Sequence, residues 1–317
     1  MKYLYSCLIA SMLICGQVLA EPTNRVFVTN EQSDTVSVIN EKTLEVESEI
    51  AVGKRPRGIG LAPDGSELYV ALGDEDAIAV IDPKTLQVIR KFGAGSDPET
   101  FAVHPNGNLY ISNEDAGIAT VFNPKTGDNI LEITVGLEPE GVAISSDGKK
   151  VVVTSESSNM LHVIAIPEHN IIANILVGAR PRDVTFSKDN KIAFSTSEIS
   201  GEVKKIDMVK HEILQVVELE GKNAKPKDIR LTPDEKKLYV AGGRANTVYV
   251  LDPQTMEVLK RIPVGKRVWG LAISSDGKRV FTTDGVDHQV SVIDTEKDEV
   301  IKAIKVGQFP WGVVIDD

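Results

Sequence analysis

The chain has 317 residues, 42% apolar and 26% charged, which is the composition of a globular protein with one large repeat domain or two ordinary ones. Its formal net charge of −11 disfavours nucleic acid and anionic membranes as partners, because both recruit basic patches. The two cysteines, Cys7 and Cys15, lie near the N-terminus, so the rest of the chain can form no disulfide, thiolate nucleophile or cysteine-ligated metal site.

Residues 1–20 have the features of a secretory signal peptide. Lys2 precedes an apolar run from Cys7 to Cys15, and the small residue Ala20 ends the segment. The apolar run is too short to span a bilayer, and the isoleucine before Cys15 makes a lipoprotein signal the weaker alternative. We therefore expect cleavage near Ala20, a periplasmic or secreted protein, no membrane span in the mature chain, and a mature domain over residues 21–317.

Seven copies of a sequence repeat of about 42 residues fill the mature chain. Each copy predicts four short strands: one after a glycine turn, one after a tight turn such as Asp-Gly or Asn-Gly, a third that ends in Asp or Asn in six copies, and a fourth leading to the next glycine. No stretch shows convincing helical periodicity. Regular four-stranded units at this period predict an all-β, seven-bladed β-propeller. The third runs end at Asn40, Asp82, Asn123, Ala165, Asp207, Asp252 and Asp294.

The two ends of the chain predict how the ring closes. The mature sequence begins with a second strand at residues 25–30, and the chain ends with a first strand at residues 312–315. We expect this C-terminal strand to complete the first blade as its innermost strand, so that each blade has four antiparallel strands. Such closure removes an exposed sheet edge.

The repeat resembles the YVTN-type propeller repeat over the whole mature chain, with residues 27–30, 68–70 and 238–240 matching its core. With its signal segment, seven units and Pro-Trp-Gly ending, the chain looks most like the periplasmic propeller family associated with PQQ-dependent alcohol catabolism. This resemblance implies a non-enzymatic accessory to a quinoprotein alcohol oxidation system. A quinoprotein dehydrogenase, an electron carrier or a transporter component would then be its partner. No cofactor is identified from the residues themselves; PQQ enters by the resemblance alone.

The copies differ most at the residue between proline and glycine of a P-x-G phrase, where the chain enters the central channel. Arginine offers forked donors to carboxylates and tryptophan a flat apolar face, so this ring predicts a site for a small polar ligand. Alternatively, opposite charges pair with each other and the tryptophans seal the ring. The position holds Arg57, Glu99, Glu140, Arg182, Lys227, Trp269 and Trp311, and the rim around it is expected to add Arg55, Arg180, Arg267, Arg244 and His288.

Enzyme chemistry has weak support in the sequence. Of five histidines only His288 is expected near the channel mouth, so a histidine-rich metal site is disfavoured and no metal site is predicted. The acidic run from Gly73 to Asp76 lacks the ligand spacing of an EF-hand loop. There is no nucleophile elbow, P-loop or dinucleotide-binding fingerprint.

Three functions stay open on this basis. The leading one is a non-catalytic binding propeller, expected to leave Arg57 or Arg182 unpaired beside an open tryptophan pocket. The second is a hydrolase of lactonase type, which would need a metal or an unpaired carboxylate near His288. The third is a scaffold for protein contacts, with a plugged mouth and an apolar patch elsewhere.

Overall fold

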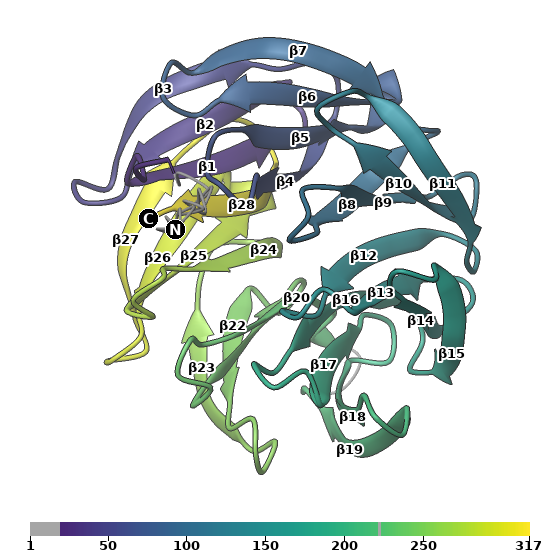
Figure 1. The fold of residues 1–317 in the computed structure, drawn as a ribbon. Helices are drawn as coiled ribbons and strands as arrows, with labels where there is room; N and C mark the ends of the chain where they lie inside the picture. Colours follow the sequence, from purple (N-terminus) through teal and green to yellow (C-terminus); the bar gives the residue numbers. More distant parts are fainter. Residues whose placement is uncertain (1–19, 221–222) are drawn as a thin grey trace, which may run out of the picture.

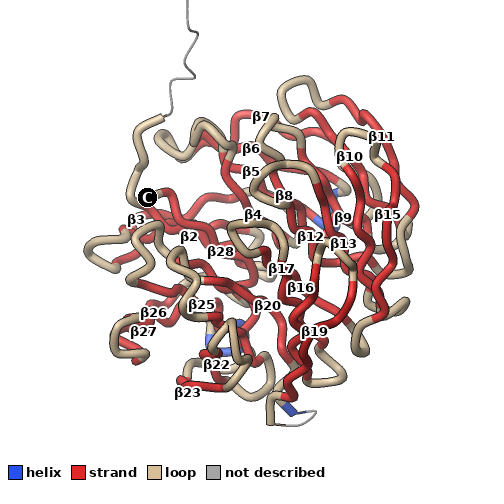
Figure 2. Tube along the Cα trace, turned by 60° about the horizontal axis from the view of Figure 1, so that its bottom comes forward, coloured by secondary structure: helices blue, strands red, loops and turns tan. Residues whose placement is uncertain are grey.

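The structure is a computed structural model that describes residues 20–220 and 223–317. The predicted signal peptide, apart from Ala20, lies outside the described residues. Seven four-stranded antiparallel sheets stand around a central axis, as predicted (Figure 1). Short loops join the strands on both faces of the ring (Figure 2). The fold is therefore a seven-bladed β-propeller.

Each blade runs from an innermost strand at the channel to an outermost strand at the surface. In that order, blade 1 holds β28 (Pro310–Asp316), β1 (Arg25–Asn30), β2 (Thr35–Asn40) and β3 (Glu45–Ala51). Blade 2 holds β4 (Pro56–Leu61), β5 (Leu68–Leu72), β6 (Ala77–Asp82) and β7 (Gln87–Gly93), and blade 3 holds β8 (Pro98–Val103), β9 (Leu109–Asn113), β10 (Ile118–Asn123) and β11 (Asp128–Thr134). Blade 4 holds β12 (Pro139–Ile144), β13 (Lys150–Ser155), β14 (Met160–Ala165) and β15 (Asn170–Leu176).

The remaining blades repeat the arrangement. Blade 5 holds β16 (Pro181–Phe186), β17 (Ile192–Ser197), β18 (Glu202–Asp207) and β19 (Glu212–Glu218). Blade 6 holds β20 (Pro226–Leu231), β21 (Leu238–Gly242), β22 (Thr247–Leu251) and β23 (Val258–Pro263), and blade 7 holds β24 (Val268–Ile273), β25 (Arg279–Asp284), β26 (Gln289–Asp294) and β27 (Glu299–Lys305). The 3₁₀ turns η1 (Gly73–Glu75) and η3 (Gly285–Asp287) lie in the loops between strands.

The ring closes as predicted, because the C-terminal strand β28 pairs antiparallel with β1 near the N-terminus. The first blade therefore joins the two ends of the chain, and its innermost strand is the last of the sequence. Within the described residues, no helix has the length and apolar character required to cross a bilayer.

Apolar packing between neighbouring blades holds the ring together. The middle strands are mostly buried, and β5 is buried along its whole length, because neighbouring sheets cover both faces of each blade. Phe27 and Val38 of blade 1, for example, share a cluster with Leu68 and Val70 of blade 2. The outermost strands, such as β19, are largely exposed. Burial of this apolar area, at roughly 25 cal/mol per Å², is the main stabilising term.

A polar contact also links five of the seven blades to the next one round. The penultimate residue of the second strand is a serine or threonine, the T of the YVTN phrase. Its hydroxyl donates to a backbone carbonyl on the next innermost strand. The pairs are Thr29 to Arg57 (2.7 Å), Ser112 to Glu140 (2.5 Å), Thr154 to Arg182 (3.4 Å), Thr196 to Lys227 (2.5 Å) and Thr283 to Trp311 (2.7 Å).

Candidate binding site at the channel mouth

A β-bulge presents each predicted ring residue to the channel. The innermost strands begin at a proline in six blades and at Val268 in blade 7, and those predicted at residues 58–62 and 141–145 begin two residues earlier than predicted. In blade 2, Pro56 pairs with Leu72 and Ile59 with Val70, so two residues oppose one between these pairs. The same register shift occurs in all seven blades. Bulges re-aim side chains at functional sites, and here they place the seven predicted residues in one mouth ring.

The turn before each bulge is also repeated. The residue that precedes the innermost strand has a left-handed backbone in every blade, although none of the seven is glycine. Its carbonyl accepts a hydrogen bond from the residue that follows the second strand, as when Gly73 donates to Arg55 at 3.1 Å. This rigid turn fixes where the chain enters the channel. The seven residues, with φ from 44° to 61°, are Arg55, Asp97, Glu138, Arg180, Lys225, Arg267 and Phe309.

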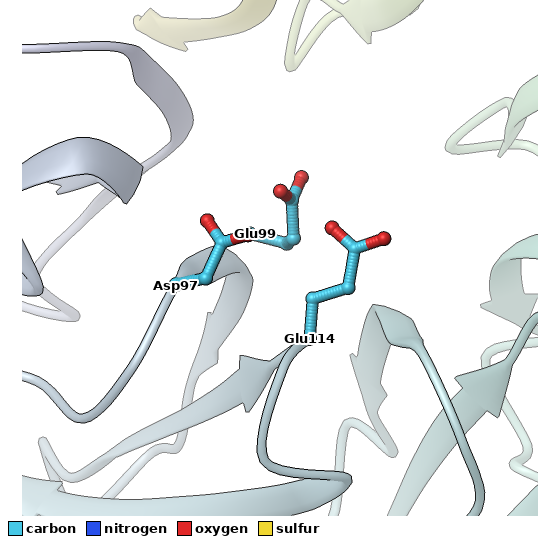
Figure 3. A group of neighbouring side chains, drawn as sticks. All are labelled: Asp97, Glu99 and Glu114. Atoms are coloured by element: carbon cyan, nitrogen blue, oxygen red, sulfur yellow. The ribbon is translucent and has the colours of Figure 1, made fainter.

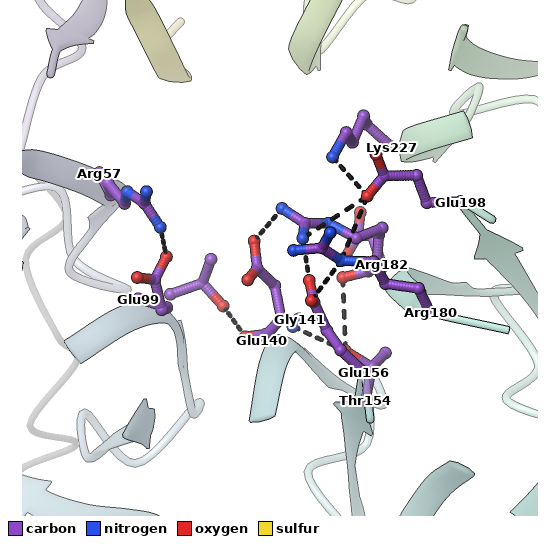
Figure 4. A network of polar contacts seen from close by, with 12 residues as sticks. Arg57, Glu99, Glu140, Gly141, Thr154, Glu156, Arg180, Arg182, Glu198 and Lys227 are labelled. Carbon is purple, nitrogen blue, oxygen red and sulfur yellow. Dashed lines mark hydrogen bonds and ion pairs between the residues drawn. The ribbon is translucent and has the colours of Figure 1, made fainter. Parts of the chain in front are cut away.

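On blades 1 to 3, the mouth-ring arginine is bound to carboxylates. Arg57 bonds Glu99 on one side (Figure 4) and Glu31 on the other, the latter at 2.9 Å. Arg55, predicted for the rim, reaches the same Glu99 at 2.6 Å and also bonds Asp97. The Glu99 side chain is fully buried. Two arginines therefore converge on one buried carboxyl group.

Blades 4 to 6 carry a second network (Figure 4). Arg182 bonds Glu140 at 2.5 Å and also bonds Glu156, while Lys227 lies 2.6 Å from Glu198. Arg180 of the predicted rim bonds Glu156 and lies 3.5 Å from Glu198. Five of the seven mouth-ring residues thus belong to charge networks. Those five are Arg57, Glu99, Glu140, Arg182 and Lys227.

The expectation that Arg57 or Arg182 is unpaired is wrong. Their partners come largely from the loop after the second strand, where Glu31, Glu156 and Glu198 extend toward the channel. Each directly follows the last residue of its strand, whereas the equivalent residues in three other blades are glycines. This substitution pattern is visible in the sequence. Each of these glutamates lies one blade before the mouth-ring cation that it pairs: Glu31 before Arg57, Glu156 before Arg182, and Glu198 before Lys227. From the sequence, these acids indicated only an acidic rim.

The two tryptophans face each other on blades 7 and 1. Their rings stack with centroids 6.3 Å apart at an interplanar angle of 25°. The Lys227 ammonium lies 4.1 Å from the centre of the Trp269 ring, and the Arg267 guanidinium lies 4.9 Å from it. Arg57 approaches Trp311 at 5.8 Å. Cations over indole faces gain about 0.5–2 kcal/mol each, so the aromatic pair is held from both sides.

Two predicted rim residues do not join the mouth ring. Arg244 is exposed in the loop between β21 and β22, and no ion pair of its side chain is found among the described residues. His288 accepts the backbone N–H of Phe309 on Nδ1 at 3.1 Å, and its ring lies 5.2 Å from the Phe309 ring. His288 therefore caps a turn, and among the described residues it has no carboxylate bonded to it that would form a hydrolytic pair.

Burial shifts two ionisation equilibria in the mouth ring. It raises the pKa of Glu99 to about 8, with a further contribution from the nearby Glu140 charge, although Arg57 opposes the shift. It also lowers the pKa of Lys227 to about 7, helped by the Arg182 charge and opposed by Glu198. Both pKa values therefore lie within about one unit of neutral pH.

Carboxylates gather on blades 3 and 4. Ligand oxygens of Asp97, Glu99 and Glu114 lie within 4.8 Å of one another (Figure 3), and so do those of Glu114, Glu140 and Glu156. No metal site was predicted, but both groups have a geometry that a divalent cation could use. Arginines already contact their buried members, since Arg57 bonds Glu99 and Arg182 bonds Glu140 and Glu156.

Beneath the mouth ring lies a chamber of about 120 Å³. All seven residues that follow the mouth-ring residues line it, so it spans the channel from blade to blade. Its charged side chains all lie on blades 4 to 6, and its aromatic and aliphatic side chains lie on the other blades except for Val142 of blade 4. The charged lining is Glu140, Arg182, Asp183, Lys227, Asp228 and Arg230, and the apolar side chains are Ile59, Phe101, Val142, Trp269, Trp311 and Val313.

Three charged residues of the chamber, Asp183, Asp228 and Arg230, were not predicted from the sequence. One Arg230 nitrogen, Nη1, contacts Asp183 at 2.5 Å and Asp228 at 2.7 Å. Burial raises the pKa of Asp228 well above its usual range; Arg230 opposes this shift and Asp183 adds to it. The signal was present, because aspartate replaces the glycine of P-x-G in these two copies only. From the sequence, the copies were compared at the residue before this glycine and were not compared at the glycine position itself.

The glycine that aspartate replaces has a steric role elsewhere in the ring. A Cβ atom on Gly141 would lie 2.2 Å from the Arg182 carbonyl oxygen, and one on Gly270 would lie 2.5 Å from the Trp311 carbonyl oxygen. The neighbouring innermost strand therefore leaves no room for a side chain at these two glycines. Blades 3, 5 and 6 carry a side chain at this position, and blades 5 and 6 use it to place a carboxyl group in the chamber.

Comparison with known proteins shows the family and the fold. A model of YNCE-like β-propellers matches residues 5–317. That description is broader than the PQQ-associated family, so the narrower resemblance stays a prediction. No curated protein sequence matches the chain significantly.

Solved structures share the propeller at low identity. A protein of unknown function from Desulfotomaculum acetoxidans DSM 771 is 17% identical, with a TM-score of 0.80 over 92% of this chain and 99% of that one. A candidate 6-phosphogluconolactonase from Bacteroides fragilis NCTC 9343 is 20% identical, with a TM-score of 0.78 over 93% and 99%. Hydrazine synthase from Kuenenia stuttgartiensis is 21% identical, with a TM-score of 0.75 over 81% and 88%. At such identities the likeness concerns the fold alone.

Proposed function

The chain belongs to the YNCE-like β-propeller family, and we propose that it is a non-catalytic binding protein whose chamber holds a small amphipathic molecule. The observation that carries this proposal is the two-sided lining of the chamber. Charged groups on blades 4 to 6 face tryptophan and aliphatic side chains on the opposite wall. Binding sites typically combine such an apolar wall with a few placed polar groups.

The size of the chamber limits the ligand. A protein cavity of about 150 Å³ holds one benzene molecule, so about 120 Å³ suits a molecule of similar size or slightly smaller. A fused-ring quinone such as PQQ is larger than this. We therefore place short alcohols, aldehydes and carboxylic acids ahead of the cofactor itself as occupants of the chamber.

The wider role follows from the sequence resemblance. We propose that the protein is secreted or periplasmic and serves a PQQ-dependent alcohol oxidation system by binding a substrate or product of that system. Its partner would be a quinoprotein dehydrogenase, an electron carrier or a transporter component. Support for this step is the signal-like segment and the YVTN-type repeats.

Intrinsic fluorescence provides a direct test, because the protein has two tryptophans and both line the chamber. The mature protein is titrated with short alcohols, aldehydes, carboxylates, lactones, Ca²⁺ and PQQ, and a thermal shift is recorded in parallel. We expect a saturable fluorescence change with at least one small organic compound. If no compound produces one, the chamber is not a binding site and a scaffold function is favoured.

A lactonase is the second candidate. Two observations favour it: the raised pKa of the buried Glu99 carboxyl group, which could donate a proton, and the structural likeness to a candidate 6-phosphogluconolactonase. The same lactone titrations, followed by pH-stat, decide between the two. Multiple turnovers that disappear in Glu99→Gln would replace the binding proposal with a catalytic one.

A further inference from the structure

We infer that the chamber selects a short-chain monocarboxylate, with its carboxylate group on Arg230 and its hydrocarbon chain against the tryptophan wall. This inference rests on the proposed binding function, and it names the class of ligand. It starts from Arg230, which lines the chamber beneath the mouth ring and retains 38% exposure of its side chain although the channel surrounds it.

Arg230 has donors to offer. Its Nη1 nitrogen contacts both Asp183 and Asp228 and donates to the Ile229 carbonyl at 2.8 Å. For its Nε and Nη2 nitrogens, no partner is found among residues 20–220 and 223–317. A guanidinium held at one nitrogen presents its other N–H groups as a planar fork, which matches the two oxygens of a carboxylate.

The two aspartates hold this guanidinium in place. Asp183 Oδ2 accepts the Ile229 N–H at 3.3 Å, and Asp228 Oδ2 accepts the Leu271 N–H at 2.8 Å. Each carboxyl group is thus anchored to the backbone of the next blade while it contacts Arg230. A donor pre-organised in this way loses little conformational freedom when a ligand binds.

The fold alone does not require an arginine there. The equivalent residue of every other blade is small or aliphatic, and those blades pack without it. Arg230 and the two aspartates therefore depart from the repeat together, on adjacent blades, and contact one another. The equivalent residues are Gly60, Ala102, Ala143, Thr185, Ala272 and Val314.

The chamber lining carries three basic side chains, Arg182, Lys227 and Arg230, and three carboxyl groups, Glu140, Asp183 and Asp228. Burial raises the pKa of Asp228 well above its usual range, and the nearby Asp183 charge adds to the shift while Arg230 opposes it. Arg182 and Lys227 line the same wall and add positive charge. An alcohol of the same chain length would gain the apolar contacts but not the forked pair, and an amine would meet the Arg230 cation.

The test compares three ligands of one chain length, butyrate, butan-1-ol and butylamine, by calorimetry and tryptophan fluorescence at pH 7. We expect butyrate to bind roughly tenfold or more tightly than butan-1-ol, because charge-assisted hydrogen bonds exceed neutral ones in strength. Arg230→Gln should weaken butyrate binding by a similar factor and leave butan-1-ol unchanged. Arg244→Gln, which alters an exposed arginine, is the matched control.

Arg230→Lys keeps the positive charge but removes the planar pair of N–H donors. It replaces the glutamine variant in this test if that variant fails to fold. It should lose part of the butyrate preference. The inference is overturned if wild-type protein binds butan-1-ol or butylamine as tightly as butyrate, or if the Arg230 variants weaken all three ligands equally. Binding of the alcohol without a carboxylate preference refutes this inference alone, whereas absence of any binding refutes the proposed function as well.

Discussion

The two halves of the channel mouth use the same backbone positions differently. On blades 2 to 5 the mouth-ring residues are charged and meet one another or loop glutamates, as Arg182 meets Glu140 and Glu156. On blades 7 and 1 the same position carries Trp269 and Trp311, which stack and line the chamber. One half is therefore closed by its own ion pairs, and the other presents apolar surface to the channel.

The difference shows how a symmetric scaffold produces an asymmetric site. The bulge and the left-handed turn before it are the same in all seven blades, so side-chain identity alone decides what each blade contributes. The charged half is expected to matter for stability, because its buried ions need their partners. The aromatic half is expected to matter for binding. Four substitutions test this division.

Arg182→Met should have the largest effect on stability. Its side chain is 7% exposed and contacts Glu140, Glu156 and Glu198, so its removal leaves buried carboxylates with less compensation. We expect a loss of about 3–5 kcal/mol in the free energy of unfolding, measured by urea denaturation. Arg244→Met, in an exposed loop, is the control and should change it by less than about 0.5 kcal/mol. Equal losses in both variants would mean that the charged half is not structural.

Glu99→Gln should change how stability depends on pH. The folded-state pKa of Glu99, about 8, lies above the ordinary value of 4.5, so the folded protein binds the proton more tightly. The stability that this proton provides is complete below pH 4.5 and is lost as pH rises through 8. Glutamine cannot ionise, so the free energy of unfolding of the variant should rise relative to that of the wild type as pH increases from 4.5 to 8. The total change should be on the order of a few kcal/mol.

Unfolding free energies at pH 5, 6, 7 and 8 provide the measurement for Glu99. Glu299→Gln is the control, since that side chain is 66% exposed on the outermost strand β27. A constant difference between wild type and the Glu99 variant over this range would show that Glu99 is ionised throughout, held so by Arg55 and Arg57.

Much of the fold could be predicted from the sequence, because each blade repeats the same local signals. Asp-Gly turns, β-branched runs and a fixed repeat length together predicted a β-propeller. The first-strand pattern at the C-terminus predicted that the last strand would complete the first blade. The starts of the innermost strands were predicted two residues late. A bulge has no simple sequence signature, and glycine after the mouth-ring residue suggested a turn where the backbone is already paired.

The mouth ring could also be predicted, because its members differ at one repeat position. Their partners could not be derived from that position alone, since Glu31 and Glu198 reach the ring from loops on neighbouring blades. The chamber depends on Arg230, three residues farther along the strand than the ring residue Lys227. Only the three-dimensional ring brings it together with Asp183, which lies 47 residues earlier.

Trp311→Leu tests the aromatic half. The side chain is half-buried, and leucine keeps part of its apolar contact, so we expect a loss of only about 1–2 kcal/mol in the free energy of unfolding. Binding of the chamber ligand should fall by roughly tenfold or more, since an aromatic wall is lost. Calorimetry measures the second effect. A variant as destabilised as Arg182→Met, with unchanged affinity, would reverse the roles assigned to the two halves.

Lys227→Met should have the smallest effect at neutral pH, because Lys227 lies between the two halves, with its ammonium 2.6 Å from Glu198 and 4.1 Å from the Trp269 ring centre. Its folded-state pKa of about 7 lies below the ordinary value of 10.5, so between these values the unfolded chain binds more protons and wild-type stability rises with pH. Methionine removes this rise. At pH 7 the two proteins should differ by only about 1 kcal/mol, because pH 7 is near the folded-state pKa of Lys227, and Arg180 and Arg182 stay 3.5 and 3.7 Å from Glu198. The wild type should become more stable relative to the variant from pH 7 to pH 9. Urea denaturation at pH 6, 7, 8 and 9 measures the difference. If the stability difference between the two proteins does not change with pH, Lys227 stays protonated over this range. Lys227 would then belong to the charged half of the mouth, which would border on Trp269.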